Sequence, residues 1–267
     1  MSPLLPRIVP SPEGKPLPQD DTAAAFRTFA RDLAAGRRPW TTEAAGFLSG
    51  LFDQLAGSWD SDLATGRDDP LHDALARGGS FPLGTCLELG SGTGLFTPTL
   101  EAAFGTVISI DLSELMLRHA AGRSPLRVRA DASALPSADA SVSVVAAIDM
   151  LLFPQELARV LAPDGVLLWI NQLGQDGPLY LSSEEVAAAL PGQWTSVEAA
   201  AGWGSWPLCD AFADPTTPGC ACQSAAAPCM RRAGRKGPPY VVRRSGRVEC
   251  GSADSSPTRW PRPTPEP

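Results

Sequence analysis

The amino-acid sequence predicts an α/β fold, in which strands joined by helical crossovers form one sheet. From Gly84 onward, short apolar runs alternate with helical stretches, as expected for strand–helix–strand units with right-handed crossovers. The run 142–148 is almost continuously apolar, which is typical of a strand buried on both faces. A glycine-rich turn at 90–94 follows the first strand, where open α/β sheets bind nucleotide-like ligands.

The segment before the sheet has a helical pattern. Apolar residues recur every three or four positions in its first helix, which Gly36 and Pro39 end. Pro70 suits the first turn of the last helix. Helices are expected over 26–33, 41–56 and 70–77. We expect the whole segment 20–79 to cover the ligand pocket and to set the choice of substrate.

The elements of the sheet region follow in alternation. Ser113 is a suitable helix N-cap, and Ser182 with Glu185 forms a capping-box pattern. The turn residues at 163–165 are expected to end a helix. Strands are expected over 85–89, 106–110, 126–130, 142–148, 166–170, 194–198 and 202–208. Helices are expected over 95–104, 113–121, 154–161 and 182–190.

The charge balance excludes several classes of partner. The net charge of the 267 residues is −7, but residues 207–267 carry +4, which leaves −11 on residues 1–206. Such an acidic body has no electrostatic footprint for nucleic acid or anionic lipid. No apolar run approaches the ~20 residues of a membrane span, and the proline-rich start lacks the apolar core of a secretory signal. We therefore expect a cytoplasmic protein with no nucleic-acid or membrane partner.

Both ends of the chain differ from the body in composition. We expect residues 1–19 to be an extended or disordered, proline-rich lead. Residues 207–267 include eleven prolines but only five Leu, Ile, Val or Phe, so we expect a disordered tail over 209–267. Its cysteines lack paired Cys-x2-Cys spacing and a histidine, so no metal site is expected. The tail is either an unrelated extension or GC-rich DNA read out of frame.

The stretch Leu87–Phe96 carries the most information about function. Gly90, Gly92 and Gly94 stand at alternate positions between a strand and a helix, where they permit positive φ and close approach of a ligand. The spacing differs from the dinucleotide pattern G-x-G-x-x-G. Glu88 would repel a pyrophosphate, but it suits a cationic or amine-bearing ligand.

Two further acidic residues follow the next two strands. Asp111 stands 21 residues after Gly90, at the end of a strand, where a carboxylate can accept hydrogen bonds from both ribose hydroxyls. Leu112 offers an apolar face to a base, and Asp131 could accept from the exocyclic amine of adenine. Each carboxylate also has a purely structural interpretation, Asp111 as a helix N-cap and Asp131 as a loop residue.

Five motifs in this order resemble a class I S-adenosylmethionine-dependent methyltransferase, from the small-molecule branch related to menaquinone and ubiquinone biosynthesis. They are Glu88–Gly94, Ile110–Ser113, Asp131–Pro136, Ser141–Val145 and Arg159–Gly165. The resemblance covers about residues 80–207. It implies a Rossmann-like three-layer sandwich with a seven-stranded, mostly parallel sheet whose last strand is antiparallel, and a methyltransferase domain over 80–208.

The resemblance also implies residue roles. The glycines would pass under the methionine part of S-adenosylmethionine, and Glu88 would orient that loop or the amino group. Asp149 would lie near the sulfonium and a small-molecule acceptor, as a catalytic candidate or simply as the end of a strand. The implied cofactor-binding set is Glu88, Gly90, Ser91, Gly92, Gly94, Asp111, Leu112, Asp131, Ala132 and Ile148.

Other functions and roles remain open at this stage. The protein could bind S-adenosylmethionine without catalysis, or be a nicotinamide-dependent oxidoreductase, although the glycine spacing and the lack of a Tyr-x-x-x-Lys motif disfavour the latter. Phe47, Phe52 and Trp59 could roof the site or pack in a core. His72 and His119 are expected at the surface.

Overall fold

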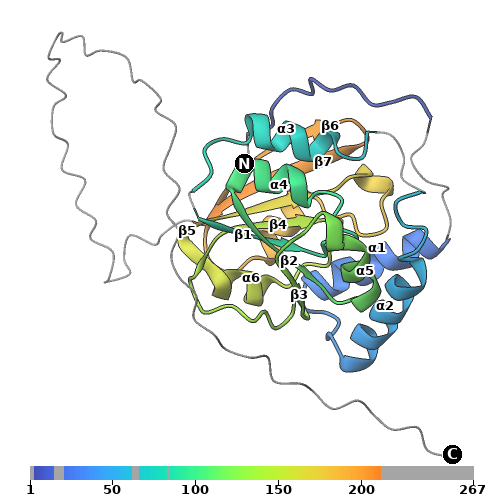
Figure 1. The fold of residues 1–267 in the computed structure, drawn as a ribbon. Helices are drawn as coiled ribbons and strands as arrows, with labels where there is room; N and C mark the ends of the chain where they lie inside the picture. The colour runs from blue at the N-terminus through green and yellow to red at the C-terminus, as the bar shows by residue number, and fades with distance from the viewer. Residues whose placement is uncertain (1–2, 15–20, 62–65, 83, 212–267) are drawn as a thin grey trace, which may run out of the picture. The chain divides into compact units, whose positions relative to one another are not determined.

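The computed structural model describes residues 3–14, 21–61, 66–82 and 84–211. All of them belong to the first of the chain's two units, Met1–Cys220. They form a seven-stranded sheet with the order β3-β2-β1-β4-β5-β7-β6 (Figure 1). The strands are β1 Thr85–Leu89, β2 Thr106–Asp111, β3 Arg127–Arg129, β4 Val142–Ile148, β5 Leu161–Ile170, β6 Trp194–Ala201 and β7 Gly204–Ala211. Strands β1 to β5 pair in parallel, whereas β7 is antiparallel to β5 and β6, which confirms the predicted sheet.

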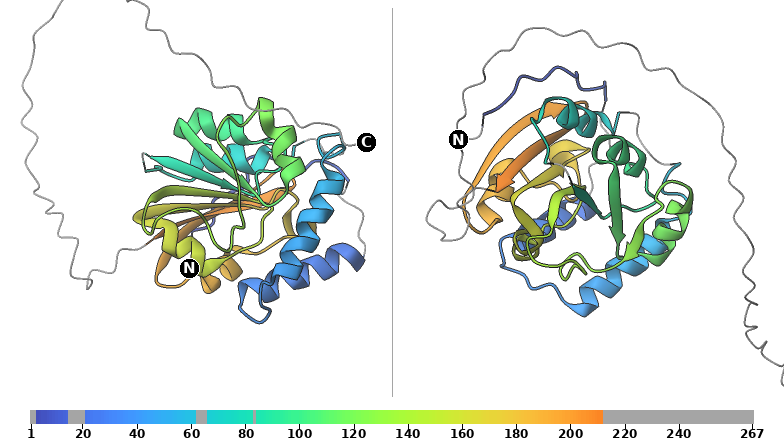
Figure 2. Two further views of the ribbon diagram at one scale, coloured as in Figure 1. Left: turned by 60° about the horizontal axis from the view of Figure 1, so that its bottom comes forward. Right: turned by 60° about the vertical axis from the view of Figure 1, so that its left-hand side comes forward.

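Helices cover both faces of the sheet, which makes the predicted three-layer sandwich (Figure 2). Successive strand residues point to opposite faces, so Val145 packs with α1, α6 and α7 while Val144 packs with α3 and α4. The helices are α1 Asp21–Ala34, α2 Thr42–Leu55, α3 Asp69–Arg77, α4 Thr97–Phe104, α5 Glu114–His119, α6 Pro154–Val160 and α7 Ser183–Ala189, with 3-10 turns η1 Ala120–Gly122 and η2 Gly174–Asp176.

Local capping signals are confirmed. The Ser113 hydroxyl accepts from the Met116 N–H at 3.1 Å, and Ser182 with Glu185 forms the complete capping box of α7. The predicted turn at 163–165 is wrong: these residues lie inside β5, because Leu161 already pairs with Val142 before a register shift in the β4–β5 ladder.

Residues 3–14 follow the extended alternative for the lead 1–19, and disorder is wrong for them, because they pair with the sheet. The Leu5 N–H donates to the Glu198 carbonyl at 2.8 Å, and Arg7 and Ser11 both donate to the Gly202 carbonyl. An extended segment rich in proline can pair this way because β6 is an edge strand with unpaired backbone groups. Residues 1–2 and 15–19 lie outside the described residues.

The expected tail boundary at 208 is also wrong, since β7 continues to Ala211. Cys209 pairs with Leu167 of β5 and Ser196 of β6, and its side chain is fully buried. Two neighbouring strands stabilise these residues although their composition is unfavourable. The prediction for 212–267, including the cysteines from Cys220 onward, lies outside the described residues.

The helical segment 20–79 divides between two places, and residues 62–65 are not described. Helices α1 and α2 lie near the carboxyl ends of the strands, whereas α3 packs on the sheet through the buried Leu71. Asp73 of α3 accepts from the indole Nε1–H of Trp206 in β7 at 2.8 Å. Thus α3 does not cover the pocket, contrary to the expectation for the whole segment. Among the described residues, no helix has the length and apolarity that a membrane crossing requires.

Candidate cofactor and acceptor site

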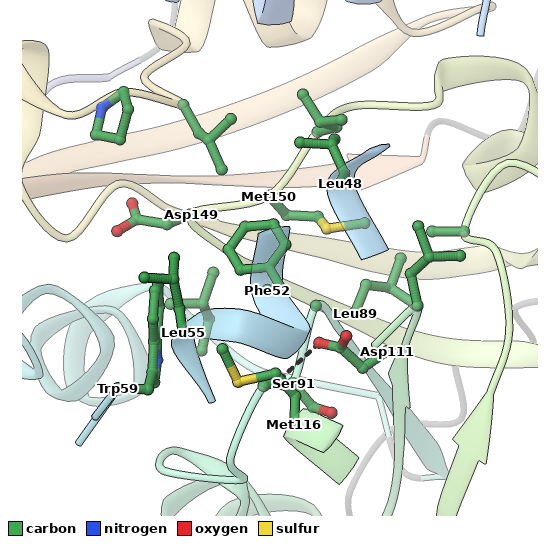
Figure 3. Close-up of a pocket in the computed structure, with 18 of the residues that line it drawn as sticks. Leu48, Phe52, Leu55, Trp59, Leu89, Ser91, Asp111, Met116, Asp149 and Met150 are labelled. Carbon is green, nitrogen blue, oxygen red and sulfur yellow. Dashed lines mark hydrogen bonds between the residues drawn. The ribbon is translucent and has the colours of Figure 1, made fainter. Parts of the chain in front are cut away.

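A cavity of about 500 Å³ lies at the carboxyl ends of the central strands. This size suits a small organic ligand. One wall consists of the loops after β1, β2, β3 and β4, and the other consists of apolar side chains from α1 and α2, among them Phe26, Leu48 and Phe52. Figure 3 shows Leu48, Phe52 and Leu55 pointing into the space between Asp111 and Asp149.

The glycine turn after β1 adopts the expected conformation. Gly90, Gly92 and Gly94 have φ values of 66°, 54° and 71°, a region that L side chains rarely adopt. Gly90 and Gly92 line the cavity, but Gly94 does not. A Cβ at Gly94 would lie 3.2 Å from the Ala120 Cβ, so this glycine allows the loop to pack on η1. The predicted contact of Gly94 with a cofactor stays a prediction, because this residue does not line the cavity.

Glu88 connects the glycine turn to its neighbours. Its Oε2 accepts from the Thr97 hydroxyl at 2.5 Å and from the Ser109 hydroxyl at 2.7 Å. Burial raises the pKa of Glu88 to about 7, and these hydrogen bonds oppose the shift. The Glu88 Oε1 and the Ser91 hydroxyl are buried at the cavity without a hydrogen-bond partner in the described structure. Buried polar atoms of this kind normally have a partner, which a ligand can supply.

Asp111, at the end of β2, holds the glycine turn through a hydrogen bond. Its Oδ2 accepts from the Gly92 N–H at 2.8 Å and its Oδ1 from the Ser113 N–H at 2.7 Å. Burial raises the pKa of Asp111, and these two backbone donors oppose the shift. A carboxylate oxygen has more than one acceptor site, so both oxygens keep capacity for ribose hydroxyls. Leu112, predicted to flank a base, lines the cavity beside it.

Asp131 and Ala132 line the cavity after β3, and Asp131 has a partner that the sequence did not suggest. The indole Nε1–H of Trp40 donates to the Asp131 Oδ2 at 2.8 Å, and the Ser133 N–H donates to its Oδ1 at 2.8 Å. The Trp40 ring packs edge-on against Phe153. Asp131 thus fixes the segment before α2 and still faces the cavity.

Helix α2 and the turn after it are fastened to these same loops. Asp53 accepts from the Ser113 hydroxyl and from the Leu115 N–H, at 2.5 and 3.0 Å. Asp60 accepts from the Thr93 hydroxyl at 2.5 Å. The ring of Trp59 contacts Phe52 edge-on, with centroids 5.8 Å apart. Phe52 and Trp59 line the cavity, and Phe52 also packs against the core, whereas Phe47 is 66 % exposed and does not line the cavity.

A second polar group lies after β4. Ile148 and Asp149 line the cavity as predicted, and Asp149 has φ 45°, which is unusual for a residue other than glycine and costs about 1–3 kcal/mol. The Gln172 N–H donates to the Asp149 Oδ1 at 2.9 Å, and Arg67 Nη2 lies 3.6 Å from Oδ2. Burial raises the pKa of Asp149 to about 6, against the opposing effect of Arg67.

Sequence reasoning missed Trp40, Arg67 and Gln172. No motif marks them, and only their position in the fold brings them to the cavity. The two histidines are at the surface as expected: His72 is 54 % exposed beside Asp68, and His119 is exposed. In the described ranges, no group of three His, Cys, Asp or Glu side chains could hold a metal ion.

Part of the chain is similar in sequence to known proteins. Residues 87–169 match the family model described as "Methyltransferase domain". The chain is 38 % identical over 100 residues to the biotin biosynthesis bifunctional protein BioHC of Cellvibrio japonicus. That match covers 33 % of this chain and 19 % of the relative, so the chain spans about one fifth of the relative's length.

One solved structure shows a similar fold. The structure of a DhpI–SAH complex matches with a TM-score of 0.51 at 20 % identity, over 61 % of this chain and 95 % of that chain. A possible histamine N-methyltransferase of Thermotoga maritima matches with a TM-score of 0.48 at 17 % identity, over 61 % and 99 % of the two chains. Residues 87–169 thus match a methyltransferase domain model, and the fold is similar to that of the DhpI–SAH complex.

Proposed function

We propose that the protein transfers the methyl group of S-adenosylmethionine to a small organic acceptor. The observation that carries the proposal is the convergence of the predicted cofactor residues, all except Gly94, on one cavity at the carboxyl edge of the sheet. Open α/β sheets bind their ligands at this edge. The resemblance to the menaquinone and ubiquinone branch stays a prediction about the acceptor.

The residues at the cavity fit the cofactor. The unpartnered Glu88 Oε1 and Ser91 hydroxyl offer polar partners beside the glycine turn. Asp111 faces the same space and would accept from the ribose hydroxyls, while Leu112, Asp131 and Ala132 would contact the adenine. The cofactor, when bound, supplies a methyl group on a sulfonium, which is an intrinsically good leaving group.

The protein's own contribution is alignment and exclusion of water. The hydrogen bonds of Asp111 and Glu88 hold the glycine turn in one conformation, so the site is organised before ligands bind. Phe52 and Trp59 form an apolar roof over the loops. A dry cavity strengthens the electrostatic contacts inside it and keeps water from competing with the acceptor.

The direct test is calorimetric titration of the full chain with S-adenosylmethionine, S-adenosylhomocysteine and NADH, with adenosine as a control. We expect both sulfur-containing ligands to bind and NADH not to bind. Absence of heat with S-adenosylhomocysteine would refute the proposal, and binding of NADH instead would favour the oxidoreductase. Release of a labelled methyl group onto an acceptor distinguishes an enzyme from a protein that only binds the cofactor.

A further inference from the structure

The polar group formed by Arg67, Asp149 and Gln172 stands apart from the predicted cofactor residues. Figure 3 shows Asp149 on the side of Leu55 and Trp59, with Phe52 drawn between it and Asp111. The three residues come from the segment before α3 and from the ends of β4 and β5, and all three line the cavity. The space therefore has two polar ends separated by apolar side chains.

The contacts within this group hold the Asp149 Oδ1 more closely than its Oδ2. Arg67 Nε donates to the Gln172 Oε1 at 2.8 Å, and the Gln172 N–H donates to the Asp149 Oδ1 at 2.9 Å. Arg67 Nη2 lies 3.6 Å from the Asp149 Oδ2, which is beyond hydrogen-bond distance. The guanidinium and Oδ2 thus lie side by side as a long ion pair, and both residues line the cavity.

Hydrogen bonds hold Asp149 in a strained backbone conformation, with a φ of 45°. Its N–H donates to the Ile170 carbonyl at 2.9 Å, and the Gln172 N–H donates to its carboxylate. Both side chains are mostly buried, with 16 % of Arg67 and 20 % of Asp149 exposed. Strained, partly buried polar residues in a cavity point to a ligand rather than to packing.

We propose that this group binds the methyl acceptor, and that the acceptor is an apolar molecule carrying a neutral hydroxyl group. The inference rests on the proposed function, because it assigns the second end of the same cavity. The acceptor hydroxyl donates to the Asp149 Oδ2, and the Arg67 guanidinium lies beside the acceptor oxygen. The aromatic and aliphatic side chains of α1 and α2 contact the apolar body.

The charge of the group selects a hydroxyl over the alternatives. Arg67 and Asp149 together are neutral, so an ammonium would meet a like charge from Arg67 and a carboxylate would meet one from Asp149. Like charges at this distance in a low-dielectric site are strongly unfavourable. A hydroxyl group meets neither penalty, since it donates to Oδ2 and its oxygen faces the cation.

The proton has a defined route in this arrangement. The O–H bond breaks, the proton moves to the Asp149 Oδ2, and the oxygen keeps the electron pair that forms the bond to the transferred methyl carbon. When bound, S-adenosylmethionine would supply this methyl group: its carbon–sulfur bond would break as the carbon–oxygen bond forms, and the electron pair would stay on the sulfur of the departing thioether. Arg67 stabilises the negative charge that develops on the oxygen, and Asp149 then releases its proton to water. Burial raises the pKa of Asp149, which makes its carboxylate a stronger base than an exposed one.

The test uses three naphthalenes with the substituent at the same ring position: naphthol, naphthoate and naphthylmethylammonium. Each is titrated calorimetrically into the full chain saturated with S-adenosylhomocysteine at neutral pH. We expect naphthol to bind at least about tenfold more tightly than either ion. Methyl transfer from labelled S-adenosylmethionine should yield the naphthyl methyl ether and no ester or methylamine.

Two variants change the charge of the group in opposite directions. Asp149→Asn leaves a net positive charge and should raise naphthoate affinity at least about tenfold, whereas Arg67→Gln leaves a negative charge and should raise naphthylmethylammonium affinity similarly. Arg67→Lys keeps the charge and should keep the preference for naphthol. Asp139→Asn and Arg118→Gln are the matched controls, because their side chains are 79 % and 69 % exposed and do not line the cavity.

The outcomes separate this inference from the proposed function. If the variants bind S-adenosylhomocysteine as the wild type does but the order of the three probes is unchanged, the group is not the acceptor site. Tighter binding of either ion, or no binding of naphthol, by the wild type overturns the hydroxyl assignment. Loss of S-adenosylhomocysteine binding by the wild type would instead overturn the proposed function itself.

Discussion

Replacing Asp111 by alanine tests whether the cofactor site has been placed correctly. Its carboxylate accepts from the Gly92 and Ser113 N–H groups at 2.8 and 2.7 Å, and the residue lines the cavity. Removing the acceptor leaves both backbone donors and, in the complex, the ribose hydroxyls without a partner. Each donor left without a partner costs about 1–3 kcal/mol where it is buried.

The expected loss of S-adenosylhomocysteine affinity is about 1–3 kcal/mol, which corresponds to about 5- to 150-fold. The free energy of unfolding should fall by a similar amount, because the glycine turn loses its anchor. Isothermal titration calorimetry measures the first quantity, and urea unfolding of the ligand-free protein measures the second.

Asp73→Ala is the matched control for stability. Asp73 is also a hydrogen-bonded carboxylate, bound to Trp206 and Arg77 and only 1 % exposed, but it lies on α3 and does not line the cavity. It should lower the free energy of unfolding without changing S-adenosylhomocysteine affinity. If Asp111→Ala lowers stability while its affinity stays within about twofold of the wild type, the ribose site is elsewhere.

Three further predictions concern the supports of the site. The wild-type free energy of unfolding should fall as pH rises from 4.5 to about 7, because the folded state holds the Glu88 proton more tightly than the unfolded chain. Urea unfolding at several pH values in this range should show that the free energy of unfolding depends less on pH in Glu88→Gln than in the wild type. An equal dependence on pH would contradict the raised pKa. Trp40→Phe keeps an aromatic ring but removes the donor to the Asp131 Oδ2, so the free energy of unfolding should fall by about 1–3 kcal/mol, and an unchanged value would show that this hydrogen bond does not support the site. Gly94→Ala should destabilise more than Gly105→Ala in thermal unfolding: both have positive φ, but only Gly94 has neighbours within 4 Å. Equal decreases in thermal stability would show that the contact of Gly94 with η1 leaves room for a methyl group.

The glycine turn and the strand ends could be predicted because their signals are local. Gly90 and Gly92 have positive φ in the turn between β1 and α4, and Asp111 is the last residue of β2. Parallel strands then bring these separate ends to one edge of the sheet. Burial follows the same logic, since the apolar run 142–148 is buried along nearly its whole length.

Composition was a poor guide at the ends of the chain. Residues 3–14 cannot build a core, yet they need only the free backbone groups of β6, such as the Glu198 carbonyl, to become ordered. Cys209 is likewise ordered by pairing with β5 and β6, and the residues next to it in sequence do not indicate this. Pairing partners far away in sequence decided both cases, and a local window contains no information about them.

At one polar end of the cavity the residues belong to a local sequence pattern, whereas at the other end the tertiary fold brings them together. This difference concerns how the protein recognises its cofactor and its acceptor. Asp111 belongs to a local pattern, whereas Arg67 and Gln172 meet across 105 positions of sequence. The strain at Asp149 appears only as a φ of 45°, because aspartate at a strand end is otherwise unremarkable. A cofactor common to many proteins can be served by short motifs in fixed order, but the acceptor is recognised by side chains that the tertiary fold assembles. Substitutions at Arg67 and Asp149 should therefore change acceptor preference while the cofactor motifs and S-adenosylhomocysteine affinity stay as they are.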